Sequence, residues 1–169
     1  MNQAFIDGQN LNIGTTRDAE KPWQVDLRKF RIYLREKYGV ELAYYFIGAF
    51  DPRYQGLYSR LQAYGYILVF REHVGSVLSH KKGNVDTDIV FEIMKKVHED
   101  EDLDKVVLVS GDGDYWRMVD YLISIGRFEK LLAPNHKAIS SLYKRTPDRF
   151  RDYLDNPSVK RKIFLKNCY

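Results

Sequence analysis

The sequence of 169 residues contains a single cysteine, Cys168, close to its C-terminal end. A lone cysteine excludes a disulfide framework within the chain and a metal cluster built from thiolates. Long apolar runs are also missing, because no stretch approaches the roughly 20 apolar residues that a membrane helix needs. The opening residues, 1–4, lack the basic segment and the long apolar core of a secretory signal. We therefore expect a cytoplasmic protein with no membrane partner.

An excess of positive charge is absent from most of the chain. The sequence has 27 lysines and arginines against 23 aspartates and glutamates, a formal net charge of +4. Residues 158–169 hold no acid, and the excess lies there in Lys160, Arg161, Lys162 and Lys166. A short basic segment attracts polyanions such as nucleic acids, although such segments are also common as solvated tails. We assign residues 1–157 to one domain and residues 158–169 to a basic C-terminal tail.

Short apolar runs alternate with amphipathic stretches along the whole chain. The runs predict five strands, at residues 4–6, 41–47, 66–70, 106–109 and 128–132. The other stretches predict helices at residues 26–38, 51–64, 84–98 and 115–125, followed by short helices at 138–143 and 148–154. Alternation of this kind is typical of a three-layer α/β/α domain with a mostly parallel, five-stranded sheet. The continuous apolar run 106–109 indicates a strand covered on both faces, so we expect the first and fourth strands to be central neighbours.

Acidic residues follow the two strands that are predicted to be central. Asp7 comes directly after the first strand, and Asp112 and Asp114 come just after the fourth. Ligand sites of parallel sheets lie at the carboxyl ends of the strands, so these carboxylates are expected to converge. Asp86, in the first turn of a predicted helix, is placed to reach the same edge, and Asn10 adds an amide there.

Carboxylates held close together repel one another unless a cation neutralises them. Oxygen ligands of this type suit Mg²⁺ or Mn²⁺, which can activate water for an in-line attack on a phosphodiester. Structural explanations exist for single residues: Asp7 suits an Asx-turn, Asp86 a helix dipole and Asp114 a helix cap. Asp112, which stands between two glycines after a buried strand, is the hardest to explain without a ligand. Asp88 is a weaker candidate, since exposed helix acids are common.

Three segments of the chain resemble motifs of the NYN family, the LabA-like branch of the PIN-like nucleases. These are the segments FIDGQNL at residues 5–11, KGNVDTD at 82–88 and VLVSGDGDY at 107–115. The resemblance spans roughly residues 4–154, with the motifs in the expected order and spacing. Two positions depart from the pattern, because Gly113 stands where serine is usual and Tyr115 where phenylalanine is usual. Neither departure removes a carboxylate.

The resemblance implies a PIN-like fold and a metal-dependent endoribonuclease that hydrolyses RNA phosphodiester bonds with metal-activated water. It implies that the metal, Mg²⁺ or Mn²⁺, is bound by Asp7, Asp86, Asp112 and Asp114. It further implies that Asn10 assists catalysis and that Ser110 positions the substrate. Single-stranded or structured RNA is the expected partner, and the sequence leaves a homo-oligomer open.

Other active-site chemistries fit the residues less well. A phosphatase of the haloacid-dehalogenase type needs a second aspartate two residues after Asp7, where this chain has Gln9. No glycine-rich phosphate loop is present, and the histidines form no Ser-His-Asp pattern. The alternative to the nuclease is a catalytically silent RNA-binding or scaffold module of the same fold. The intact acidic set argues against it, because carboxylates repel phosphate.

A phosphodiester strand that approaches an acidic cluster needs cations around it. Arg71, Lys81 and Lys82 belong to the predicted long loop, residues 71–83, that leads to Asp86, and we expect them to bind substrate. Aromatic side chains can stack on unpaired bases, and Trp23 and Trp116 are the candidates.

Overall fold

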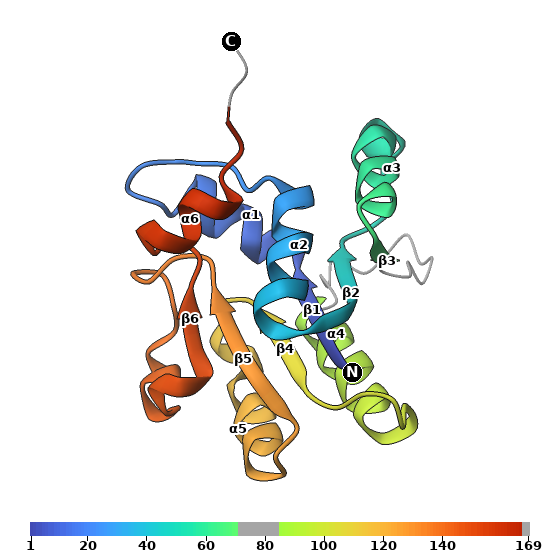
Figure 1. Ribbon diagram of the computed structural model, residues 1–169, viewed down its shortest axis with the longest axis vertical. Coiled ribbons are helices and arrows are strands. Elements are labelled where there is room, and N and C mark those ends of the chain that lie inside the picture. The colour runs from blue at the N-terminus through green and yellow to red at the C-terminus, as the bar shows by residue number, and fades with distance from the viewer. Residues whose placement is uncertain (71–84, 167–169) are drawn as a thin grey trace, which may run out of the picture.

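The computed structural model describes residues 1–70 and 85–166. Six parallel strands form one sheet in the order β3-β2-β1-β4-β5-β6 (Figure 1). Their bounds are β1 Asn2–Asp7, β2 Val40–Ile47, β3 Tyr66–Phe70, β4 Val106–Val109, β5 Phe128–Ala133 and β6 Arg151–Tyr153. The α/β class and the parallel sheet are confirmed. The expected number of five strands is wrong by one, because β6 was not anticipated.

The centre of the sheet is formed by β1 and β4, as the apolar run at residues 106–109 predicted. All four residues of β4 are fully buried, and Ile6 of β1 pairs with Val109 of β4. The two strands run in parallel and end level with each other. The residues that follow them therefore emerge side by side at the carboxyl edge of the sheet.

Helices cover both faces of the sheet. Their bounds are α1 Gly8–Thr16, α2 Leu27–Tyr38, α3 Gln55–Ala63, α4 Val85–Glu99, α5 Trp116–Ser124 and α6 Pro157–Ile163. Short 3-10 helices lie at η1 Pro52–Tyr54, η2 Gly113–Tyr115, η3 Ser141–Arg145 and η4 Asp148–Phe150. On one face Ile6 packs with Phe30 of α2, and on the other Phe5 packs with Ile89 of α4 and Leu122 of α5. None of the described helices is both long enough and apolar enough to cross a membrane.

Helix α1 was not expected from the sequence. Its nine residues include two glycines and several poor helix formers, so composition gives little helical signal. The carboxylate of Asp7 starts the helix by accepting a hydrogen bond from the backbone N–H of Asn10 at 2.9 Å. Burial of Leu11 and Thr15 then holds it against the sheet.

The helix expected at residues 148–154 is wrong, and the segment forms η4 and the edge strand β6 instead. Asp152 of β6 accepts hydrogen bonds from the Nζ of Lys37 at 2.7 Å and the hydroxyl of Tyr38 at 2.8 Å. Burial alone would raise the pKa of Asp152, but these two donors lower it below its usual value. Contacts from α2 therefore fix a strand too short to be recognised by periodicity.

The first part of the basic segment expected as a tail forms α6. Asn156 caps this helix by accepting a hydrogen bond from the backbone N–H of Ser158 at 3.1 Å. Val159 and Ile163 are buried in the same cluster as residues of α2. Lys160 lies over the ring of Trp23, with Nζ 4.9 Å from the ring centroid. Lys160, Arg161 and Lys162 are thus carried by a packed helix, and Lys166 lies beyond its end.

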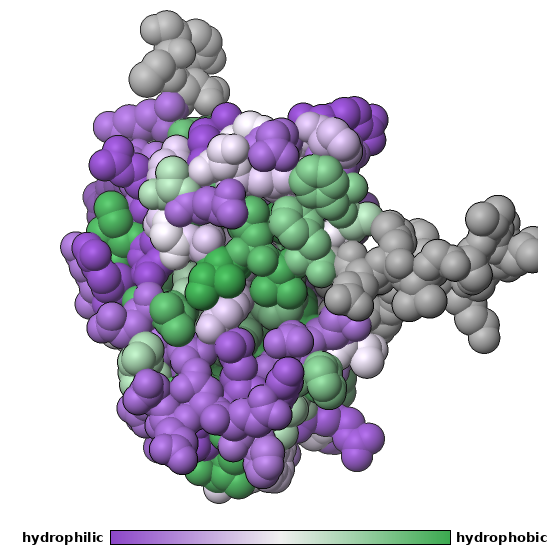
Figure 2. All heavy atoms as spheres, turned by 90° about the vertical axis from the view of Figure 1, so that its right-hand side faces the viewer, coloured by the Kyte–Doolittle hydropathy of each residue, from purple (hydrophilic) through white to green (hydrophobic). Residues whose placement is uncertain are grey.

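The edge of the sheet formed by β3, which lies opposite the β6 edge, is apolar. Figure 2 views the side of the molecule that carries α3 and β3, and apolar side chains gather there. All five residues of β3 are apolar or aromatic, and Ile67 among them is exposed. The edge strand therefore lacks the charged side chains that commonly protect such an edge from other chains.

Candidate metal centre

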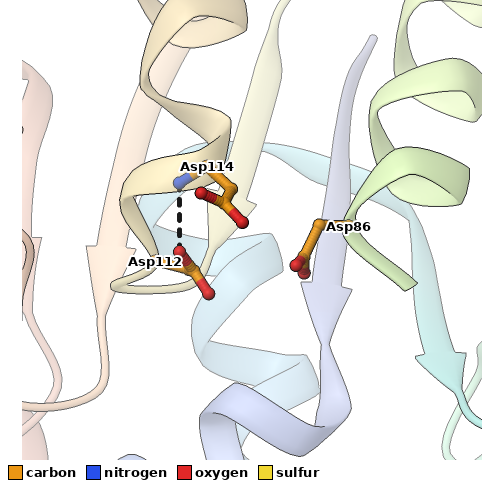
Figure 3. A group of neighbouring side chains, drawn as sticks. All are labelled: Asp86, Asp112 and Asp114. Carbon is orange, nitrogen blue, oxygen red and sulfur yellow. Dashed lines mark hydrogen bonds between the residues drawn. The ribbon is translucent and has the colours of Figure 1, made fainter. Parts of the chain in front are cut away.

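Three acidic side chains from two segments converge at the carboxyl edge of the sheet. Asp112 and Asp114 follow β4, and Asp86 is the second residue of α4. Each offers a carboxylate oxygen, and these oxygens all lie within 4.8 Å of one another (Figure 3). Asp114 is exposed, whereas Asp86 and Asp112 are half-buried. The cluster is therefore open to solvent on the side of Asp114.

The loop after β4 is held by hydrogen bonds at successive residues. The backbone N–H of Asp112 donates to the hydroxyl of Ser110 at 3.1 Å, and the carboxylate of Asp112 accepts from the N–H of Asp114 at 3.0 Å. Tyr143 donates its hydroxyl hydrogen to the carbonyl of Asp112 at 2.6 Å. These contacts fix the backbone on both sides of Asp112 and hold its carboxylate next to that of Asp114.

Ser110 is fully buried, and its hydroxyl accepts a hydrogen bond from the loop backbone. In this geometry the hydroxyl holds the loop after β4. Asn10 has a comparable contact, because its side-chain oxygen accepts a hydrogen bond from the N–H of Gly111 at 2.8 Å. The catalytic and substrate roles expected for these two residues remain predictions.

Asp7 lies next to the cluster but outside the group of three. It is the last residue of β1 and is 5% exposed. Its Oδ1 caps α1, and its Oδ2 accepts a hydrogen bond from the hydroxyl of Tyr115 at 3.0 Å. The oxygen of the same hydroxyl lies 2.6 Å from Oδ1 of Asp86, so its one hydrogen is available to either carboxylate. Tyr115 therefore connects Asp7 to the cluster.

Tyr115 was not selected as a site residue from the sequence. Its departure from the phenylalanine of the family pattern was the available signal. Tyr115 is fully buried, and burial raises the pKa of its hydroxyl, as do the charges of Asp7 and Asp86. The group therefore stays a hydrogen-bond donor throughout the physiological range of pH.

The charges of the cluster act on Asp7. Burial raises the pKa of Asp7 above its usual value, and the nearby charges of Asp86 and Asp112 raise it further. Hydrogen bonds from Asn10 and Tyr115 oppose this effect. The repulsion expected between crowded acids thus acts in the direction of a raised pKa at Asp7, although burial contributes more than the neighbouring carboxylates.

The donor set fits a hard divalent cation. Carboxylate oxygens are the ligands that Mg²⁺ and Mn²⁺ prefer, and these ions suit sites built from one or two carboxylates with water. Asp88, the weaker candidate, is exposed and does not belong to the group of three. The described residues thus bring Asp86, Asp112 and Asp114 together, with Asp7 joined to them through Tyr115.

Of the cations and aromatic residues expected to contact substrate, Trp23 and Trp116 lie in the part of the chain that the structure describes. Arg71, Lys81 and Lys82 lie outside the described residues. Trp23 is 5% exposed and lies beneath Lys160, so the expectation that it stacks on a base is wrong in this geometry. Trp116 is half-buried, and the guanidinium of Arg145 lies 5.5 Å from the centroid of its ring.

Comparison with known proteins identifies the family of the chain. A family model described as the NYN domain matches residues 3–155, which include all four aspartates. The chain belongs to the NYN domain family. This confirms the resemblance to the LabA-like branch of the PIN-like nucleases seen in the sequence.

A relative of this NYN domain is the Low amplitude and bright protein LabA of Synechococcus elongatus. The two are 30% identical over 127 residues, which cover 70% of this chain and 65% of LabA. The match thus spans just under two thirds of the length of that relative.

The fold also occurs in a solved structure of a protein of unknown function from Vibrio parahaemolyticus. The TM-score is 0.73, with 21% sequence identity, and the match covers 96% of this chain and 94% of the other. At this level of identity the likeness concerns the fold.

Proposed function

We propose that this NYN domain is a metal-dependent endoribonuclease that cleaves RNA phosphodiester bonds at its aspartate cluster. The observation that carries the proposal is the approach of the Asp86, Asp112 and Asp114 carboxylates to within 4.8 Å of one another. Membership of a nuclease family supports it. Like charges held at this separation are unfavourable unless a cation is bound between them.

Each residue of the site has a role in this proposal. Asp86, Asp112 and Asp114 hold Mg²⁺ or Mn²⁺, and Asp7 supports them from the end of β1. When bound, the metal activates water and stabilises the charge that develops on the phosphate. Asn10 and Ser110 keep the loop after β4 in place, so that the carboxylates stay directed at the substrate.

The substrate approaches from the side on which Asp114 is exposed. We retain Arg71, Lys81 and Lys82 as proposed phosphate contacts, because they precede Asp86 in the chain. Such contacts give affinity without sequence preference. We further propose that RNA, single-stranded or structured, is the physiological partner and that the protein acts in the cytoplasm.

A cleavage assay tests the proposal. Labelled single-stranded RNA, an RNA hairpin, tRNA and DNA are incubated with the protein in Mg²⁺, in Mn²⁺ and in excess chelator. We expect internal cleavage of RNA that needs the metal and stops with chelator. Asp112→Asn should reduce cleavage to the background rate, while Asp120→Asn, an exposed acid on α5, should leave it unchanged.

Two results would contradict the proposal. RNA binding without cleavage in any metal would favour the silent binding module of the same fold. Preferential cleavage of DNA would keep the nuclease and reject RNA as its substrate.

A further inference from the structure

The hydroxyl of Tyr115 lies between carboxylates that come from different parts of the chain. It is 3.0 Å from Oδ2 of Asp7, at the end of β1, and 2.6 Å from Oδ1 of Asp86, at the start of α4. Tyr115 itself follows Asp114 directly in η2. The hydroxyl of Tyr115 therefore contacts the end of β1 and the start of α4, and Tyr115 itself belongs to the third segment that supplies acidic residues.

The ring and the hydroxyl of Tyr115 have different roles. The ring is fully buried and packs in the apolar cluster with Ile89 of α4 and Met118 of α5. A phenylalanine ring would fill the same space. The hydroxyl adds no apolar contact, and placing it in a buried position costs free energy unless it forms hydrogen bonds. Here its hydrogen bonds run to carboxylates of the proposed metal centre.

We propose that the Tyr115 hydroxyl is a positioning group that sets the orientation of Asp7 and Asp86 and thereby the affinity of the site for metal. A carboxylate that is free to rotate must lose that freedom when it binds a cation. A hydrogen bond that already fixes the carboxylate removes part of this cost. The inference rests on the metal centre proposed above, but not on RNA being the substrate.

The geometry also gives the two carboxylates unequal roles. The oxygen of Tyr115 carries one hydrogen and so donates to one carboxylate at a time. The contact with Asp86 is the shorter one, and Asp86 belongs to the group of three oxygens within 4.8 Å of one another. When Tyr115 donates to Asp86 it holds that carboxylate in the cluster, and when it donates to Asp7 it fixes the carboxylate at the end of β1.

Substitution of Tyr115 by phenylalanine tests the inference, because it removes the oxygen and keeps the ring. The matched control is Tyr66→Phe. Tyr66 is 3% exposed and donates its hydroxyl hydrogen to the carbonyl of Leu27 at 2.8 Å, away from the acids. Both variants lose one buried tyrosine hydroxyl and one donor.

Mn²⁺ affinity is measured by titration calorimetry, together with the melting temperature of the metal-free proteins. Residues that orient metal ligands change metal affinity by roughly 10–100-fold when they are replaced. We expect the Kd for Mn²⁺ to rise by about 10-fold or more in Tyr115→Phe and to stay within 2-fold, roughly, in Tyr66→Phe. Cleavage by Tyr115→Phe should need more Mn²⁺ but approach the wild-type rate at saturation.

The outcomes separate this inference from the proposed function. Equal Mn²⁺ affinity in Tyr115→Phe and wild type would overturn the inference and leave the nuclease intact. Weakened affinity in a protein that binds Mn²⁺ but cleaves no RNA would support the inference and reject the nuclease. Equal loss of affinity in both variants would overturn the inference, because a general loosening of the core would then explain it. A wild-type protein that binds no Mn²⁺ would overturn both.

Discussion

The side-chain oxygen of Asn10 accepts a hydrogen bond from the backbone N–H of Gly111 at 2.8 Å, across 101 residues of sequence. This contact joins the first turns of α1 to the loop that carries Asp112. It ties together the two segments that follow the central strands. The pairing of β1 with β4 sets the relative position of Asp7 and Asp112, and this contact reinforces it.

Replacing Asn10 by alanine should loosen this connection. The N–H of Gly111 loses its acceptor, and such a loss typically costs about 1–3 kcal/mol of stability. We also expect weaker Mn²⁺ binding, since the loop with Asp112 is no longer braced. Denaturant unfolding and calorimetry measure the two effects. Asn12→Ala, at an exposed position on the same helix, is the control; it should lower neither Mn²⁺ affinity nor stability, because alanine favours a helix more than asparagine does.

Gly113 departs from the family pattern for a visible reason. A Cβ at this position would lie 2.5 Å from Oγ and 3.0 Å from Cβ of Ser140. Gly113→Ala should therefore lose about 1–3 kcal/mol through overpacking. Because Asp112 and Asp114 flank this residue, Mn²⁺ affinity should fall as well.

Ser140→Gly should recover most of that loss when it is combined with Gly113→Ala, because it removes the obstructing side chain. Urea unfolding of the single and double variants gives the coupling free energy. Strictly additive losses would show that Ser140 is not the obstacle.

Asp7 should make the stability of the metal-free protein depend on pH. Burial raises its pKa in the folded protein above the usual value of 3.8. The folded state then binds this proton more tightly than the unfolded chain, so stability falls as pH rises from 3.8 through the raised pKa. Asp7→Asn removes this titration and keeps a good helix cap.

We expect metal-free Asp7→Asn to melt at or above the wild-type temperature at pH 7, and to lose that advantage below about pH 4. Calorimetric scans with chelator from pH 3 to 8 measure the difference. Asp120→Asn serves as the exposed control. A difference between Asp7→Asn and wild type that stays constant with pH would contradict the assignment.

The basic helix α6 should contribute to RNA affinity. Truncation after Pro157 is a poor test, because it removes the buried side chains of Val159 and Ile163. Lys162→Gln keeps these contacts and removes one exposed cation. The slope of log K against log salt should decrease by roughly 0.7 for a single-stranded RNA if one phosphate contact is lost.

Turnover of Lys162→Gln at saturating RNA should match wild type, since this residue acts on affinity. The matched control is Lys95→Gln, an exposed lysine of α4 beside the acidic turn at residues 99–102, which should leave the slope unchanged. Equal effects of both substitutions would mean that net charge, not the position of α6, governs binding.

Strand ends and burial made much of the site predictable from sequence. The apolar run of β4 marked the centre of the sheet, and parallel strands place their following residues at one edge. The sequence alone could thus place Asp112 and Asp114 at the same edge of the sheet as Asp86. The residue pattern could not reveal that Asp7 is set back behind Tyr115, because that depends on how a buried ring is oriented.

The features that the sequence did not reveal depend on contacts between distant residues. β6 is held by the contact of Asp152 with Lys37, 115 positions away. α1 begins with a side-chain cap in a segment of low helical propensity. The crowding at Gly113 comes from Ser140, which lies in a different segment. Local composition carries little information about such contacts.

The central position of β1 has a consequence for synthesis of the protein. This first strand is completed by pairing with β4, whose residues are made about a hundred positions later. Until then a nascent chain exposes one side of β1, and two of the three clustered acids, Asp112 and Asp114, have not yet been made. A nascent chain that has not reached Asp114 therefore lacks part of the acidic cluster and cannot complete the proposed metal centre.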